Sequence, residues 1–214
     1  MKTKKNKNID DKLKKKNSSF LLSFFIDYFK PSTYVNSILD IDLDELKNQG
    51  IKLIICDLDN TLVPHFRKFP TNSSIKFIEN VKDHQFKFVI ISNNTEKRVK
   101  FFAEKLGIKE DYIANAKKPF PKKTKKFLEE KFQGKYKNSE IVIIGDMIIT
   151  DIFVANILRI NSILVPPLLE PEKFMNKILS FTEKKVFKRL SRENLITTKP
   201  NYQNNDNLDK YELL

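Results

Sequence analysis

The chain has 214 residues, 40% of them hydrophobic, which is enough for one α/β domain of ordinary size with short extensions. Its formal net charge of +13 favours anionic partners such as phosphorylated metabolites, an anionic membrane or nucleic acid, although solvated lysine-rich helix faces would give the same charge. The single cysteine, Cys56, excludes an internal disulfide and favours a reducing compartment, and no apolar stretch is long enough to span a bilayer.

The first 50 residues predict a basic tail followed by short elements. Residues 1–17 hold eight lysines and little that is apolar, so we expect a disordered tail. Residues 18–30 could form a short helix with a broad apolar face, which would pack on the core or lie in a membrane interface. Asp27 interrupts this apolar run and no small-residue cleavage site follows, so we interpret it as retained rather than as a signal peptide. Residues 31–44 are interpreted as a connecting segment and residues 44–49 as a short helix.

Residues 51–63 combine a short apolar run with two closely spaced carboxylates. The run at residues 53–56 suits a strand buried on both faces, and Asp57, Asp59 and Thr61 follow where that strand should end. In an extended chain Asp57 and Asp59 project the same way, so they would repel unless a cation lies between them or one is protonated. Ligands bind outside the carboxyl ends of strands in open α/β sheets, so this stretch predicts a metal-assisted reaction.

Strands and helices alternate through the rest of the chain. Short apolar runs predict strands at residues 86–91, 111–114, 141–144 and 161–165, and helical periodicity predicts helices at residues 72–84, 95–106, 123–132 and 150–158. This alternation is typical of an α/β fold with a single parallel sheet and helices on both faces.

The periodicity also predicts inward faces and the domain organisation. Ile75, Ile78 and Val81 share one face of the helix at residues 72–84, so we expect all three to be buried. A further helix is predicted at about residues 171–190, with Phe181 on its apolar side. The predicted organisation is a basic tail (1–17), one domain (18–193) with its core at about 51–166, and a polar tail (194–214).

Polar side chains follow four of the predicted strands. Each could have a purely structural role, since an aspartate after a strand often caps a helix and a lysine before proline is usually exposed. Jointly, three carboxylates, a hydroxyl and a lysine at successive strand ends are hard to explain by folding alone. The groups are Asp57, Asp59 and Thr61, then Ser92 and Asn93, then Lys118, and finally Asp146 and Asp151.

These groups resemble the four motifs of the haloacid dehalogenase (HAD) superfamily of aspartate-nucleophile phosphatases. The first motif, DxDx[TV], is met by Asp57-Leu58-Asp59-Asn60-Thr61, and the second and third by Ser92 and Lys118. The fourth, GDxxxxD, runs from Gly145 to Asp151, so the resemblance covers about residues 51–165. It implies a Rossmann-like phosphatase domain, and the short gaps between the motifs leave no room for a cap domain.

The resemblance also implies a role for each group. Asp57 would be the nucleophile that forms an aspartyl-phosphate, and Asp59 would be the general acid and base. Mg²⁺, which prefers oxygen ligands, would be held by Asp57, the backbone carbonyl of Asp59, Asp146 and Asp151. Phosphate-binding groups would come from Ser92, Asn93, Lys118 and Thr61.

A closer resemblance extends over about residues 20–190. Lys30-Pro31, Tyr34-Val35-Asn36-Ser37-Ile38, Asp40-Ile41 and Gly50-Ile51-Lys52 resemble the leader of the YqeG-like (subclass IIIA) branch, which includes mitochondrial-type phosphatidylglycerophosphatases. The branch usually carries Gly-Gly-Asn-Arg-x-Gly after the last motif, where this chain has Val154-Ala155-Asn156-Ile157-Leu158-Arg159. The resemblance implies an anionic phospholipid, phosphatidylglycerol phosphate, as the substrate. The basic tail and the apolar segment at residues 20–29 agree with this substrate, because they would favour peripheral contact with the inner face of the membrane from the cytoplasm.

Two alternatives remain open on sequence grounds. One is a soluble HAD phosphatase that acts on a nucleotide or sugar phosphate. The other is a nucleic-acid-associated binding protein, for which no zinc-ligand spacing is present, so we expect no nucleic-acid partner.

Overall fold

The computed structural model describes residues 26–169, 177–194 and 196. The predicted tail at residues 1–17, most of the predicted helix at residues 18–30, the start of the helix at residues 171–190 and nearly all of the polar tail lie outside the described residues. Within the described residues, no helix is both long and apolar enough to cross a membrane.

Six parallel strands form one sheet, in the order β1-β6-β5-β2-β3-β4. The two central strands are wholly buried because helices cover both faces, which is why their sequences are nearly continuous apolar runs. The predicted α/β fold with a parallel sheet is confirmed. The strands are β1 (Thr33–Tyr34), β2 (Leu53–Asp57), β3 (Lys87–Ile91), β4 (Tyr112–Ile113), β5 (Ile141–Gly145) and β6 (Asn161–Leu164).

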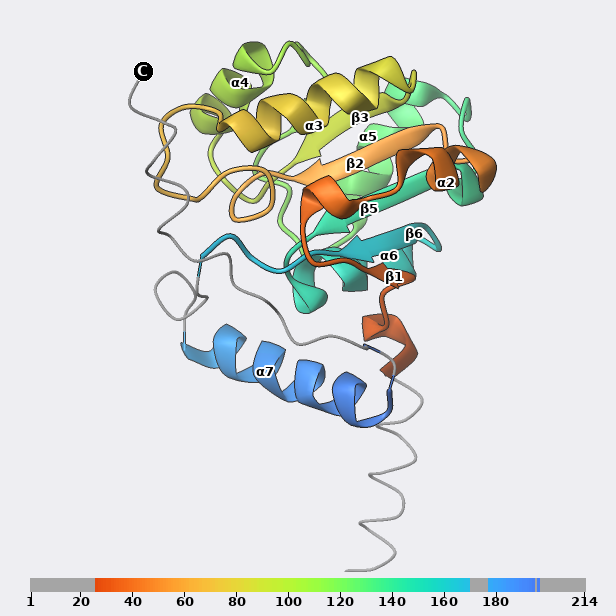
Figure 1. The fold of residues 1–214 in the computed structure, drawn as a ribbon, viewed down its shortest axis with the longest axis vertical. Helices are drawn as coiled ribbons and strands as arrows, with labels where there is room; N and C mark the ends of the chain where they lie inside the picture. Colours follow the sequence, from red (N-terminus) through yellow and green to blue (C-terminus); the bar gives the residue numbers. More distant parts are fainter. Residues whose placement is uncertain (1–25, 170–176, 195, 197–214) are drawn as a thin grey trace, which may run out of the picture.

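The helices form a layer on each side of the sheet (Figure 1). One layer holds α2 (Leu43–Asn48), α3 (Asn72–Asp83) and α4 (Glu96–Lys105), and the other holds α5 (Lys122–Phe132) and α6 (Phe153–Ile157). A last helix, α7 (Lys177–Arg192), packs through Leu190 near β6 and the π-helical turn η4 (Ile148–Ile152). Three short 3₁₀ turns, η1 (Asp27–Phe29), η2 (Ile38–Asp40) and η3 (Asn138–Glu140), complete the described elements.

Two sequence predictions are wrong in detail. The segment at residues 31–44 is more than a connection, because β1 within it forms the outer edge of the sheet beside β6. Ile75 is exposed, and Phe77 takes the buried place beside Ile78 and Val81, because the ring of Phe77 packs against Phe88 of β3. Whether the helix at residues 171–190 packs on the sheet was left open by the sequence, and Phe181 in it is exposed.

The described connections between the strands carry no inserted cap domain. Between β2 and β3 the chain holds a loop and α3, and between β4 and β5 it holds only α5 and η3. The carboxyl ends of β2, β3, β4 and β5 therefore meet at an edge of the sheet that no inserted domain within residues 26–169 covers.

Candidate active site

The predicted site residues lie together at the carboxyl edge of the sheet. Asp57 ends β2, Ser92 follows β3, Lys118 follows β4, and Asp146 and Asp151 follow β5. All five line a cavity of about 520 Å³, together with Asp59, Asn93 and several neighbouring side chains. Because parallel strands end at the same edge, groups far apart in the sequence are brought within reach of one small ligand.

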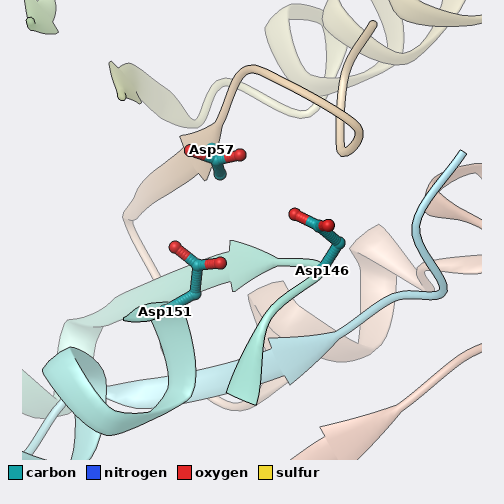
Figure 2. A group of neighbouring side chains, drawn as sticks. All are labelled: Asp57, Asp146 and Asp151. Carbon is teal, nitrogen blue, oxygen red and sulfur yellow. The ribbon is translucent and has the colours of Figure 1, made fainter. Parts of the chain in front are cut away.

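Three carboxylates gather at the centre of this cavity. One oxygen from each of Asp57, Asp146 and Asp151 lies within 4.8 Å of the others, and the side chains point toward one another (Figure 2). Lys118 Nζ donates hydrogen bonds to Asp57 Oδ1 and Asp151 Oδ1, each at 2.5 Å. Among the described residues, a single ammonium group therefore faces three buried or half-buried carboxylates, which leaves an excess of negative charge.

Burial and the repulsion among the carboxylates shift the pKa values of the cluster. Burial raises the pKa of Asp57 to about 7, against the opposing effect of Lys118, and the charge of Asp151 raises it further. Burial also raises the pKa of Asp146 well above its usual range, with Asp57 and Asp151 adding to the shift. Burial alone would lower the pKa of Lys118, but the Asp151 and Asp57 carboxylates outweigh it and raise that pKa. Such a cluster of oxygen ligands could hold a metal cation, which would relieve the repulsion.

Asp59 lies in a separate set of contacts. Its Oδ1 accepts a hydrogen bond from Arg98 Nε at 2.9 Å and forms an ion pair with Nη2 of the same guanidinium at 2.7 Å. Its Oδ2 accepts from Asn94 Nδ2 at 3.0 Å and from Ser92 Oγ at 3.3 Å. The carboxylate of Asp59 is thus held at the cavity wall by a forked arginine and two neutral donors, outside the cluster of three aspartates.

Sequence reasoning missed Arg98 and Asn94. Arg98 comes from α4, where its guanidinium also donates to the carbonyl of Arg67 at 2.7 Å and lies over Phe102. The sequence did contain one signal for Arg98. Only five of the 40 basic residues are arginines, and arginine is favoured over lysine where a carboxylate is held by several donors, so each arginine was a candidate partner for a site aspartate.

Two residues predicted to bind phosphate make structural contacts through their side chains. Asn93 donates from Nδ2 to the carbonyl of Lys118 at 2.9 Å and accepts at Oδ1 from the Lys118 N–H at 2.7 Å. The buried Thr61 hydroxyl donates to Asp146 Oδ1 at 2.9 Å. These side chains orient the lysine and the aspartate that the cavity presents.

The loop that carries Asp151 is fixed from two sides. Asp151 Oδ2 accepts from the Met147 N–H at 3.1 Å and the Thr150 hydroxyl at 3.2 Å. From α7, Glu183 accepts from the Ile148 N–H at 2.6 Å and the Ile149 N–H at 3.0 Å. Burial raises the pKa of Glu183 to about 7, although the two N–H donors act to lower it. No sequence signal identified this contact, because Glu183 is 35 residues from Ile148 along the chain.

Comparisons with known proteins agree with this geometry. A family model described as mitochondrial PGP phosphatase matches residues 23–166. The protein named "Probable phosphatase YqeG" of Bacillus subtilis (strain 168) is 35% identical over 166 residues, which cover 78% of this chain and 94% of that protein.

Solved structures share parts of the fold at low identity. An uncharacterized protein from Listeria monocytogenes serotype 4b is 22% identical, covers 59% of this chain and 83% of its own, and has a TM-score of 0.46. The 3-deoxy-D-manno-octulosonate 8-phosphate phosphatase of Moraxella catarrhalis is 18% identical, covers 49% of this chain and 64% of its own, and has a TM-score of 0.39.

A parallel sheet without a cap, with the four aspartate, serine and lysine motifs at its carboxyl edge, defines an HAD-type phosphatase. Within that superfamily the chain is YqeG-like. It belongs to the mitochondrial PGP phosphatase family.

Gly145 has a specific steric role beside the cluster. A Cβ added at this position would lie 2.3 Å from Asp151 Cγ. We expect Gly145→Ala to cost about 1–3 kcal/mol of unfolding free energy through this clash, and to lower phosphatase activity because Asp151 must move. Urea unfolding and phosphate release would be measured on the same preparations.

Gly134→Ala is the matched control for that prediction. Gly134 has a φ of 77° with no atom within 4 Å of an added Cβ. The substitution should cost about 1–2 kcal/mol through backbone strain alone and leave the turnover number unchanged. If both variants lost activity in proportion to stability, Gly145 would have no special relation to Asp151.

Proposed function

We propose that this phosphatase removes the terminal phosphate of phosphatidylglycerol phosphate to give phosphatidylglycerol, acting from the cytoplasm at the inner face of the membrane. The observation that carries the proposal is the family match over residues 23–166. The uncapped cavity supports it, because a phosphate attached to a bulky lipid can approach without a lid having to open. The net charge of +13 favours an anionic substrate and an anionic surface.

In this proposal Asp57 is the nucleophile, and Asp59 is the general acid and base. The Asp57 carboxylate attacks phosphorus, so that an O–P bond forms while the bond to the lipid oxygen breaks. Asp59 gives its proton to the departing glycerol oxygen, then takes a proton from the water that hydrolyses the aspartyl-phosphate. Arg98, Asn94 and Ser92 position the Asp59 carboxyl group at the wall of the cavity for this exchange.

Ser92 and Lys118 would stabilise the negative charge on the transferred phosphoryl group. Lys118 Nζ already lies within hydrogen-bond distance of Asp57 Oδ1, so it can also reach oxygens of a phosphoryl group bound there. Ser92 Oγ lines the cavity beside Asp59. Asn93 would contribute its backbone N–H, since its side chain is engaged with Lys118, and Thr61 would act through Asp146.

Mg²⁺ is the metal that we propose for the three-aspartate cluster. The donors are all oxygens, and their negative charge exceeds what Lys118 can balance, which fits a small divalent cation. Asp57, Asp146 and Asp151 would hold the ion together with the backbone carbonyl of Asp59. When bound, it supplies positive charge that lets an anionic phosphate approach an anionic nucleophile.

Metal binding can be tested without an activity assay. Mg²⁺ should raise the melting temperature of the metal-free protein, because a ligand at a hundred times its dissociation constant adds about 2.7 kcal/mol of stability. Asp146→Asn should remove most of this stabilisation while leaving the fold intact, since asparagine can still accept from Thr61. An equal shift in both proteins would place the metal elsewhere.

Arg98 is expected to act through Asp59 rather than on the substrate. Arg98→Lys removes the forked contact, so we expect kcat to fall on the order of tenfold to a hundredfold, with KM little changed. Arg189→Lys, which alters the ion pair between Arg189 of α7 and Glu193 just after that helix, should leave both parameters unchanged.

The proposed substrate is tested by phosphate release from phosphatidylglycerol phosphate in mixed micelles with Mg²⁺. Nucleotide and sugar phosphates at equal concentration provide the comparison. The proposal requires a clearly higher kcat/KM for the lipid. Cleavage of the water-soluble esters alone would replace it with a soluble-metabolite phosphatase.

A further inference from the structure

Exposed phenylalanines gather on two loops at the carboxyl edge of the sheet. Four large apolar side chains are more than half exposed among the described residues, and three of them belong to these loops. Phe66 (57% exposed) and Phe69 (63%) lie in the loop after β2, and Phe120 (69%) lies in the loop after β4. Single exposed apolar residues are ordinary, but a concentration around one site indicates a function. We refer to these three side chains as the aromatic rim.

The aromatic rim belongs to two loops that also contribute residues to the lining of the phosphatase cavity. Phe66 follows His65, and Phe120 comes two residues after Lys118; both His65 and Lys118 line the cavity. The first loop is also tied to the catalytic edge, because Arg98 binds both Asp59 and the carbonyl of Arg67. A surface docked on these two loops would therefore be close to the cavity.

Basic side chains surround these phenylalanines. The first segment reads Phe66-Arg67-Lys68-Phe69, and the second reads Lys117-Lys118-Pro119-Phe120-Pro121-Lys122-Lys123. Neither segment contains an acidic residue, and Lys68, Lys117 and Lys122 are exposed. Apolar rings between cations match a bilayer interface, where rings enter the headgroup layer and ammonium groups meet lipid phosphates.

We propose that the aromatic rim and its flanking lysines dock on an anionic lipid bilayer, with Phe66, Phe69 and Phe120 inserted at headgroup level. The inference rests on the proposed function, because docking in this orientation is useful only if the substrate is a phosphorylated lipid headgroup that the cavity must reach. It assigns membrane contact to the loops of the catalytic edge. The apolar segment at residues 18–30 and the basic tail are then not required to orient the enzyme.

Cosedimentation of the full-length chain with vesicles tests the docking surface. Vesicles of phosphatidylcholine and phosphatidylglycerol in equal parts would be compared with pure phosphatidylcholine, at low and at high salt. Salt screens the attraction of the lysine-rich N-terminal segment, so the binding that persists at high salt reports inserted apolar side chains, and the part of it lost in the ring variants is the part owed to the aromatic rim. Phe66→Ser with Phe120→Ser should weaken this salt-resistant binding at least about tenfold.

Phe181→Ser is the matched control, because Phe181 is a phenylalanine of similar exposure (59%) on α7, outside both loops. It should bind vesicles as the wild type does. Hydrolysis of a small soluble ester such as p-nitrophenyl phosphate should be the same in all three proteins, because none of the substituted side chains lines the cavity.

The outcomes separate this inference from the proposed substrate. If the double variant binds vesicles as tightly as the wild type, or if Phe181→Ser weakens binding equally, the docking surface is wrong even when the lipid is hydrolysed. If the double variant loses vesicle binding while phosphatidylglycerol phosphate proves not to be a substrate, the docking surface stands and the substrate assignment fails.

Discussion

Asp57→Asn is expected to lower phosphate release by a factor on the order of 10⁴ or more, because the substitution removes the attacking carboxylate. Asparagine keeps the shape of the side chain, and Lys118 retains Asp151 as a partner, so the variant should stay folded. Single-turnover phosphate release and thermal unfolding would be measured together. The variant should also fail to trap a phosphorylated enzyme when the reaction is quenched with acid.

Asp111→Asn provides the control for this result. Asp111 is another partly buried aspartate paired with lysines, Lys87 and Lys131, but it lies outside the cavity. Its substitution should leave the rate of phosphate release unchanged. Equal rates for wild type and Asp57→Asn would remove Asp57 as the nucleophile.

Lys118→Met is expected to have the largest effect on stability. Lys118 is 4% exposed and is shared by Asp57 and Asp151, so its loss leaves buried carboxylates without a cation. Breaking a buried pair in this way costs about 3–5 kcal/mol, which urea unfolding of the metal-free protein would detect. Loss of a charge that faces the transferred phosphoryl group should also lower kcat by about 10²-fold or more.

Lys87→Met serves as the control for Lys118→Met. Lys87 pairs with Asp111, but its side chain is 38% exposed, so removing its charge should cost less than about 1 kcal/mol. Added Mg²⁺ should return part of the stability lost in Lys118→Met, because a second cation then faces the carboxylates. A loss no greater than that of Lys87→Met would mean that Lys118 does not balance the cluster.

Local patterns in the sequence were sufficient to predict most of the fold. The apolar runs that became β2, β3 and β5 are unambiguous because a strand buried on both faces tolerates few polar residues. The two-residue strand β1 carries no such pattern. It forms because it pairs with β6, where Ser32 and Ser162 exchange backbone-to-hydroxyl hydrogen bonds across 130 residues of sequence.

The orientation of individual helices was less predictable. The spacing of Ile75, Ile78 and Val81 fits one helical face, but a face shifted toward Phe77 fits almost as well. The choice between them depends on the surface of the sheet below, where Phe77 meets the ring of Phe88. Periodicity therefore predicts a helix and an approximate face, while packing decides the rotation.

The sequence by itself determined the class of chemistry, because carboxylates, a serine and a lysine directly after predicted parallel strands must meet at one edge of the sheet. Only the tertiary structure decided how these groups are paired. It joined Asp59 to Arg98 from α4, Lys118 to Asp57 and Asp151, and Glu183 from α7 to the turn that carries Asp151. The physical reason is that strand ends follow from local periodicity, whereas a charged partner is selected by distance in space, which no local pattern records.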